Sequence, residues 1–127
     1  MQLSAILETV LYYAAPEEEE VERFYRDVLG LRSVGRWPDG FAFRLGDGLL
    51  LLFEAERTSS RDDEWARHGA SGSVHACFLA PPDQYEAWKE RVAAEQEVTW
   101  KSGVRSFYFR DPAGNLLEIA EGDLWPE

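Results

Sequence analysis

The chain has 127 residues, 45% of them hydrophobic, and a formal net charge of −11 at pH 7. This length suffices for one domain with a hydrophobic core, and no apolar run approaches the roughly 18 residues of a membrane span. The negative charge argues against nucleic acid and anionic membrane surfaces as partners. Because the N-terminus lacks a signal-peptide pattern and Cys77 is the single cysteine, we expect a cytoplasmic protein in which Cys77 is a reduced core residue.

The first half of the chain predicts a strand, a helix and three further strands. Pro16 begins a helical pattern in which four glutamates precede an apolar stripe, and Gly30 ends it. The first strand carries Glu8 and Tyr12 on one face, because strand side chains alternate. The expected elements are a strand over Ala5–Tyr13, a helix over Glu17–Leu29, and strands over Leu31–Trp37, Phe41–Leu45 and Leu49–Glu54.

The second half repeats this order after a polar connection. Asp83, with Glu86 three residues later, fits a capping box at a helix start. Pro112 and Gly114 predict a turn between the last two strands. The expected elements are a connection over Thr58–Gly72, strands over Val74–Leu79 and Val98–Trp100, a helix from the Asp83 cap to about Ala94, and hairpin strands over Phe107–Phe109 and Leu116–Ile119.

The sequence contains an internal repeat of one supersecondary unit. The aromatic run over 41–44 aligns with the run over 107–110 at an offset of 66, and the strand that holds Glu8 aligns with the strand that holds His75 at an offset of 67. Both halves read β-α-β-β-β, which predicts an α+β fold. We expect a single domain over 1–127, with repeats over 5–55 and 73–121 and a connection over 56–72.

The repeat marks polar residues at equivalent strand positions. Glu8 aligns with His75, and Glu118 of the last strand aligns with Leu52 of the first half. If the halves pack around a pseudo-twofold axis, these positions converge. One imidazole with two carboxylates suits Mn, Fe, Co, Ni or Zn as a divalent ion. Taken singly, a strand histidine or glutamate also fits a structural role or the solvated face.

Three pieces of the sequence are typical of one superfamily: VERFYRDVLGL over 21–31, FYFRDPAGNLLE over 107–118, and the strand that holds His75. Through them nearly the whole chain resembles the vicinal oxygen chelate superfamily. That superfamily includes glyoxalase I, extradiol dioxygenases, methylmalonyl-CoA epimerase and the fosfomycin- and bleomycin-resistance proteins. These motifs indicate the fold and the position of a site, but they do not indicate which reaction is catalysed.

The resemblance implies two β-α-β-β-β units that form an incomplete eight-stranded cup around one divalent metal ion, in a homodimer. It implies Glu8, His75 and Glu118 as metal ligands. Leu52 stands at the fourth ligand position of glyoxalase I, so the chain is more similar to three-ligand members, whose metal ion takes a substrate through two adjacent oxygens. We therefore expect Glu118 to act in catalysis as well as in metal binding.

Further candidate catalytic and substrate-binding residues also fit a structural or surface role. Tyr12 shares a face with Glu8 and is either a catalytic hydrogen-bond donor or a packing residue. Substrate-binding candidates are Arg105 and Lys101, which otherwise are surface charges, His68 in the connection, and Phe107, which otherwise packs in the core.

Three functions remain open at the level of sequence. The first is a metal-dependent enzyme of lyase, isomerase or dioxygenase type that acts on a small substrate. The alternative is a metal-free protein of the bleomycin-resistance type that binds a small aromatic or cationic molecule. The third is a scaffold whose cup is filled by its own side chains.

Overall fold

The computed structural model describes residues 1–125, and the chain divides into two compact units, Met1–Val74 and a second that begins at His75. Each unit holds one four-stranded mixed sheet, so the predicted α+β class and the two β-α-β-β-β units are confirmed. The single domain over 1–127 stays a prediction, and its last two residues lie outside the described residues.

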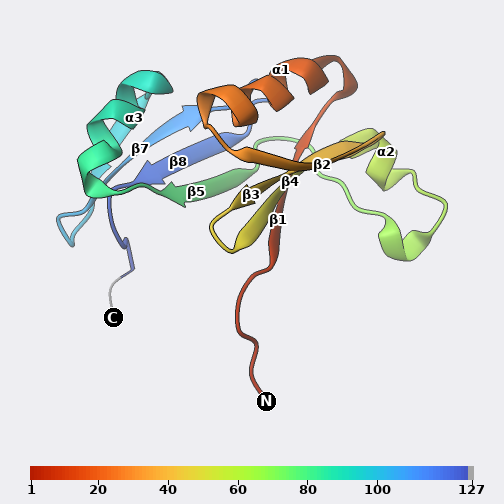
Figure 1. The fold of residues 1–127 in the computed structure, drawn as a ribbon, viewed down its shortest axis with the longest axis horizontal. Coiled ribbons are helices and arrows are strands. Elements are labelled where there is room, and N and C mark those ends of the chain that lie inside the picture. The colour runs from red at the N-terminus through yellow and green to blue at the C-terminus, as the bar shows by residue number, and fades with distance from the viewer. Residues whose placement is uncertain (126–127) are drawn as a thin grey trace. The chain divides into compact units, whose positions relative to one another are not determined.

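The first unit contains the sheet order β1-β4-β3-β2, in which β1 runs parallel to β4 and the other neighbours are antiparallel (Figure 1). Its strands begin and end close to the predicted positions, although β1 begins three residues late. The elements are β1 (Glu8–Tyr13), η1 (Ala15–Glu17), α1 (Glu18–Arg23), η2 (Phe24–Val28), β2 (Arg32–Trp37), β3 (Gly40–Leu45), β4 (Gly48–Glu54), α2 (Ala55–Ser59) and η3 (Glu64–Ala66).

The predicted helix over Glu17–Leu29 is present as the continuous run η1, α1 and η2. Its last turn is a π-helix, in which the Leu29 amide donates to the Phe24 carbonyl, and Gly30 ends the run with a φ of 69°. Val21 and Tyr25 of the predicted apolar stripe are buried, and the Tyr25 ring stacks 6.0 Å from Phe43 of β3. One face of the sheet therefore forms the core beneath this helix.

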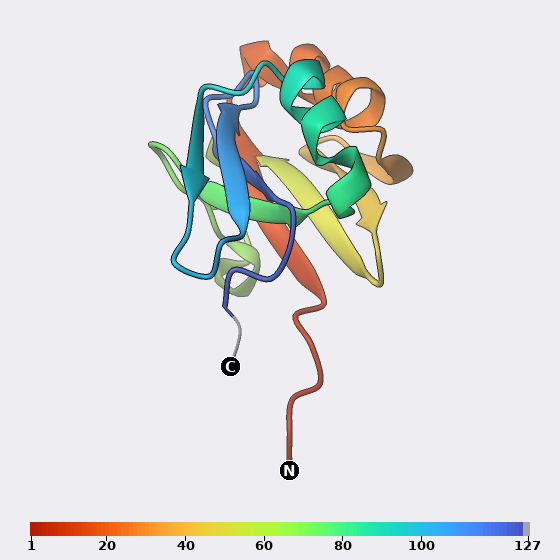
Figure 2. The same ribbon diagram turned by 90° about the vertical axis from the view of Figure 1, so that its left-hand side faces the viewer.

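The second unit repeats the topology with the order β5-β8-β7-β6. The helix α3 covers one face of its sheet (Figure 2), where the Tyr85 ring packs 5.3 Å from Phe107. The capping box predicted at Asp83 is wrong, because Gln84 is the N-cap residue and makes no side-chain capping bond. The elements are β5 (His75–Leu79), η4 (Pro82–Gln84), α3 (Tyr85–Arg91), β6 (Gln96–Thr99), β7 (Arg105–Arg110) and β8 (Leu116–Ala120).

The strand register corrects one feature of the predicted repeat. In the first unit Val10 pairs with Leu51, whereas in the second unit Cys77 pairs with Glu118. Since Val10 and Cys77 are equivalent at the offset of 67, the counterpart of Glu118 is Leu51 and not Leu52. Leu52 points to the opposite face and is fully buried beneath the helix.

The turn between β7 and β8 is fixed by Asp111. Its Oδ1 accepts from the amides of Ala113 and Asn115, each at 2.9 Å, and its Oδ2 accepts from Nδ2 of Asn115 at 2.8 Å. Gly114 supplies the left-handed residue of this turn with a φ of 87°. The turn sets the register that places Glu118.

We expect Asp111→Ala to lower the free energy of unfolding by about 2 kcal/mol, because it leaves buried amide donors without their acceptor. Denaturant titration followed by circular dichroism measures this change. Asp123→Ala is the matched control, since Asp123 accepts one amide bond at an exposed position near the C-terminus. An equal loss in the two variants would contradict the role of Asp111.

Candidate functional site

The candidate site lies on the face of the second sheet that is opposite α3. The pairing of Glu118 with both Cys77 and Tyr108 puts these side chains on one face, because residues that pair across strands point to the same side. His75 and Ser106 share that face by the period of two. The predicted core position of Cys77 is wrong, because Cys77 is exposed on this face.

His75 is held in one orientation by the backbone of β8. Its Nδ1 lies 2.9 Å from the carbonyl oxygen of Leu116, which can only accept a hydrogen bond. The proton of the neutral imidazole therefore resides on Nδ1, and the lone pair of Nε2 faces Oε1 of Glu118 at 3.3 Å. A cation or a proton between these two atoms relieves the repulsion of their lone pairs.

Glu118 is the buried charge of this face, with 4% of its surface exposed. Its Oε2 accepts a hydrogen bond of 2.5 Å from the Ser106 hydroxyl, and Ser106 in turn accepts from Nε1 of Trp100 at 2.9 Å. These bonds stabilise the carboxylate in a site that would otherwise disfavour its charge.

The two strand neighbours of Glu118, Cys77 and Tyr108, are neutral. Desolvation, followed by the nearby Glu118 carboxylate, raises the pKa of the Cys77 thiol to about 12. Burial and the same carboxylate also raise the pKa of Tyr108. Both groups are consequently protonated at neutral pH, which leaves Glu118 as the negative charge to which a cation is attracted.

The pair His75 and Glu118 fits a divalent metal ion. Metal-bound histidines usually donate their second ring N–H to a carbonyl or carboxylate, as His75 does to Leu116. Ligand atoms about 2.1 Å from a shared ion lie roughly 3 Å apart, which matches the 3.3 Å between Nε2 and Oε1. Within residues 1–125, however, no group of three or more His, Cys, Asp or Glu side chains gathers as a metal site. Glu8 belongs to the first unit, and its place in the triad stays a prediction.

Glu8 occupies the expected strand position in its own unit. It pairs with Leu49 across β1 and β4, just as His75 pairs with Leu116 across β5 and β8, which confirms the offset of 67 between these strands. Glu8 is exposed at the first position of β1. Its side chain is therefore accessible to an ion or to solvent.

The first unit brings Tyr12 and His68 together, two candidates far apart in sequence. The Tyr12 hydroxyl lies 2.7 Å from Nδ1 of His68, and Nε2 of His68 lies 3.5 Å from Arg61. Arg61 is paired with Asp39 at 2.6 Å, and burial raises the pKa of Tyr12. The connection is thus attached to the first unit by a polar network on the face that also carries Glu8.

Arg105 and Phe107 lie on the opposite face of the second sheet from Glu118. Phe107 is fully buried against Tyr85, which gives it a packing position. Arg105 binds Glu121 through Nε at 2.9 Å, and its guanidinium lies 4.7 Å from the Tyr85 ring. Lys101 is exposed in the turn between β6 and β7. The structure therefore does not place these three candidates with His75 and Glu118.

Hydrogen bonds from Arg105 hold the pKa of Glu121 below its usual value of 4.5. A lowered carboxyl pKa stabilises the folded state above the unfolded-state value, and this contribution disappears as the pH falls through the folded-state value. We expect Glu121→Gln to melt at a lower temperature than wild type at pH 7, with the gap closing below pH 4.5. Calorimetry across this range tests the prediction, and a gap independent of pH would contradict it.

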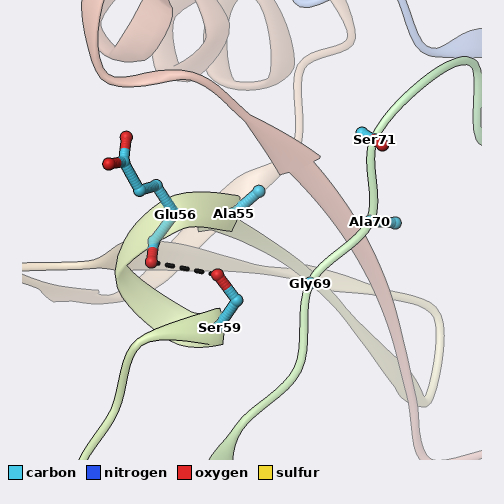
Figure 3. A pocket seen from close by; sticks show the side chains of 6 residues that line it. All are labelled: Ala55, Glu56, Ser59, Gly69, Ala70 and Ser71. Atoms are coloured by element: carbon cyan, nitrogen blue, oxygen red, sulfur yellow. Dashed lines mark hydrogen bonds between the residues drawn. The ribbon is translucent and has the colours of Figure 1, made fainter.

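Each unit contains a cavity that other residues line. One of about 350 Å³ lies between α2 and the end of the connection (Figure 3), where Ser59 donates to the Glu56 carbonyl at 3.1 Å. A second of about 430 Å³ lies beside Pro81, Pro82 and Glu121. None of the candidate site residues lines either cavity. Among the described residues, no helix is long and apolar enough to cross a membrane.

Sequence reasoning missed Ser106, Trp100 and Tyr108 as neighbours of Glu118. Ser106 and Tyr108 could have been found, because both alternate with the aromatic core residues of β7 and so point to the Glu118 face. Trp100 carried no such signal, since it lies outside the strands and reaches Ser106 through the turn between β6 and β7.

A family model confirms the superfamily that the sequence resembles. The model of the Glyoxalase/Bleomycin resistance protein/Dioxygenase superfamily matches residues 11–119. This match spans most of the chain, and the chain therefore belongs to this superfamily.

Individual relatives agree with this assignment. The crystal structure of lactoylglutathione lyase from Agrobacterium tumefaciens is 41% identical, has a TM-score of 0.89, and is matched over 98% of both chains. Glutathione transferase FosA from Serratia marcescens is 28% identical over 90% of this chain and 79% of its own length. A glyoxalase/bleomycin resistance protein/dioxygenase from Nocardioides, 21% identical with a TM-score of 0.72 over 100% of this chain and 91% of its own, shares the fold.

Proposed function

We propose that the chain is a divalent-metal-dependent enzyme of lyase or isomerase type that binds a small substrate through two adjacent oxygens. The observation that carries the proposal is the approach of His75 Nε2 to Glu118 Oε1 at 3.3 Å, with Nδ1 tied to the Leu116 carbonyl. Glu8, at the equivalent strand position of the first unit, is proposed as the third ligand. The identity of 41% to a lactoylglutathione lyase favours lyase or isomerase chemistry over dioxygenase chemistry.

In the proposed mechanism, His75, Glu118 and Glu8 hold the ion, which when bound would polarise a substrate carbonyl as a Lewis acid. Glu118 is also proposed as the base that accepts a proton from a substrate carbon, through Oε1, the oxygen that the Ser106 hydroxyl does not engage. The protonated groups of Tyr108 and Cys77 flank it and add no competing negative charge. Tyr12, fixed by His68, is proposed as a hydrogen-bond donor to a substrate oxygen.

Formation of S-lactoylglutathione from glutathione and methylglyoxal is the reaction to test first, with protein stripped of metal and then loaded with Ni²⁺, Zn²⁺, Mn²⁺ or Fe²⁺. We expect thioester absorbance to rise with loaded protein and to remain constant with stripped protein, because the equilibrium favours the thioester. Equal turnover by the two forms would contradict metal dependence. If neither the stripped nor the loaded protein shows turnover, and tryptophan fluorescence detects binding of aromatic or cationic compounds, the result would instead support the metal-free binding protein.

A further inference from the structure

Ser106 is a buried hydroxyl between an obligatory donor and a carboxylate. The indole Nε1 of Trp100 can only donate, and it lies 2.9 Å from Oγ of Ser106. Ser106 is fully buried, so its own proton requires an acceptor within the protein. Oε2 of Glu118 lies 2.5 Å away. Donation therefore runs in one direction, from Trp100 to Ser106 to Glu118.

This direction distinguishes the two oxygens of Glu118. Oε2 is engaged by a short, charge-assisted hydrogen bond, whereas Oε1 faces Nε2 of His75. Rotation of the carboxylate would break the bond to Ser106 and leave a buried hydroxyl without its acceptor. Such a loss costs about 1–3 kcal/mol, which is enough to favour one orientation strongly.

The turn before β7 explains why Trp100 reaches this position. The Trp100 amide donates to the Val104 carbonyl at 2.9 Å, and the Gly103 amide donates to the Trp100 carbonyl at 2.9 Å. Gly103 adopts a φ of 86°, which glycine tolerates without strain. The closed turn holds the indole against β7, where Ser106 is the second residue.

We propose that Ser106, supported by Trp100, is a positioning residue that presents Oε1 of Glu118, together with Nε2 of His75, to a divalent cation. The inference deepens the proposed function and rests on it, because it assigns the orientation of one proposed ligand. Ser106 itself touches neither the cation nor the substrate. It acts by occupying Oε2, so that one oxygen of Glu118 is presented and the other is not.

Visible absorption of Co²⁺ during titration tests this inference without an activity assay. We expect Ser106→Ala to weaken Co²⁺ binding by roughly 10- to 100-fold and to change the absorption bands, because Oε2 is then released. Ser106→Thr keeps the hydroxyl and should restore the wild-type spectrum. Ser33→Ala, which removes an exposed serine hydroxyl in β2, is the matched control.

The outcomes separate the two proposals. Wild-type affinity and an unchanged spectrum in Ser106→Ala would overturn the positioning role while leaving the metal site intact. Absence of Co²⁺ binding by wild type would overturn the proposed function and the inference with it. If Ser106→Ala does not fold, Trp100→Phe removes the donor alone, and it should weaken Co²⁺ binding in the same direction by a smaller factor. No change in Trp100→Phe would then overturn the positioning role of Ser106 and Trp100.

Discussion

Leu52→Glu is expected to prevent folding, whereas Leu51→Glu is expected to leave a folded protein. Leu52 is fully buried under the helix of the first unit, and a glutamate there would lose apolar packing and bury an unpaired charge. Together these effects cost roughly 5 kcal/mol or more, which is comparable to the whole stability of a small domain. Leu51 points to the other face and is itself 7% exposed, so a glutamate there loses apolar burial but reaches solvent at the open face of the sheet, and its substitution should cost about 2–3 kcal/mol.

The comparison of the two variants measures the register of β4. Circular dichroism and urea titration of both proteins, with wild type as reference, give the difference in the free energy of unfolding. A folded Leu52→Glu beside an unfolded Leu51→Glu would mean that Leu52 is the counterpart of Glu118 after all, and equal losses in the two variants would contradict the expected difference between the two faces of β4. Unfolding of Leu52→Glu alone would agree with the pairing of Val10 with Leu51.

The second large effect is expected for Glu118→Gln. The amide retains an oxygen that accepts from Ser106 but loses the negative charge that attracts a cation. We expect affinity for Zn²⁺ or Ni²⁺ to fall on the order of 100-fold or more, and metal-dependent turnover to fall with it. The melting temperature should change little, because glutamine has nearly the same size and replaces a buried charge.

Glu121→Gln is the matched control for this substitution, since Glu121 pairs with Arg105 on the opposite face. Calorimetric titration with Zn²⁺ should show binding by wild type and by Glu121→Gln, and weak binding by Glu118→Gln. Retained affinity in Glu118→Gln would remove Glu118 from the ligand set. Weak binding by both variants would point to a general electrostatic effect of the acidic chain.

Most of the fold could be predicted because local signals and the repeat agree. Pro16 and Gly30 bracket the helix, and the aromatic strands β3 and β7 align with each other. The exception is the register of β4. The alignment of the two halves used the same offset of 66 before and after the turn that precedes β4 and β8, but this turn is one residue longer in the second half. Four residues separate the paired Arg44 and Leu49, whereas five separate Arg110 and Leu116. That single residue exchanges the two faces of the strand.

The candidate site could be predicted where strand alternation determines it. His75 and Glu118 occupy positions that parallel pairing of β5 and β8 brings together, and the structure places them 3.3 Å apart. Contacts that depend on loops had no such signal. The approach of His68 to Tyr12 requires the path of the whole connection, and that of Trp100 to Ser106 requires the closed turn before β7.

The metal content of the wild-type protein tests the central proposal most directly. The protein would be purified without a metal-affinity tag, incubated with Mn²⁺, Fe²⁺, Ni²⁺ or Zn²⁺, desalted and measured by mass spectrometry beside His75→Ala. We predict near one equivalent of one of these metals in wild type and little in His75→Ala. An absence of metal from wild type after every incubation, or equal metal in both proteins, would contradict a metal centre built on His75 and Glu118.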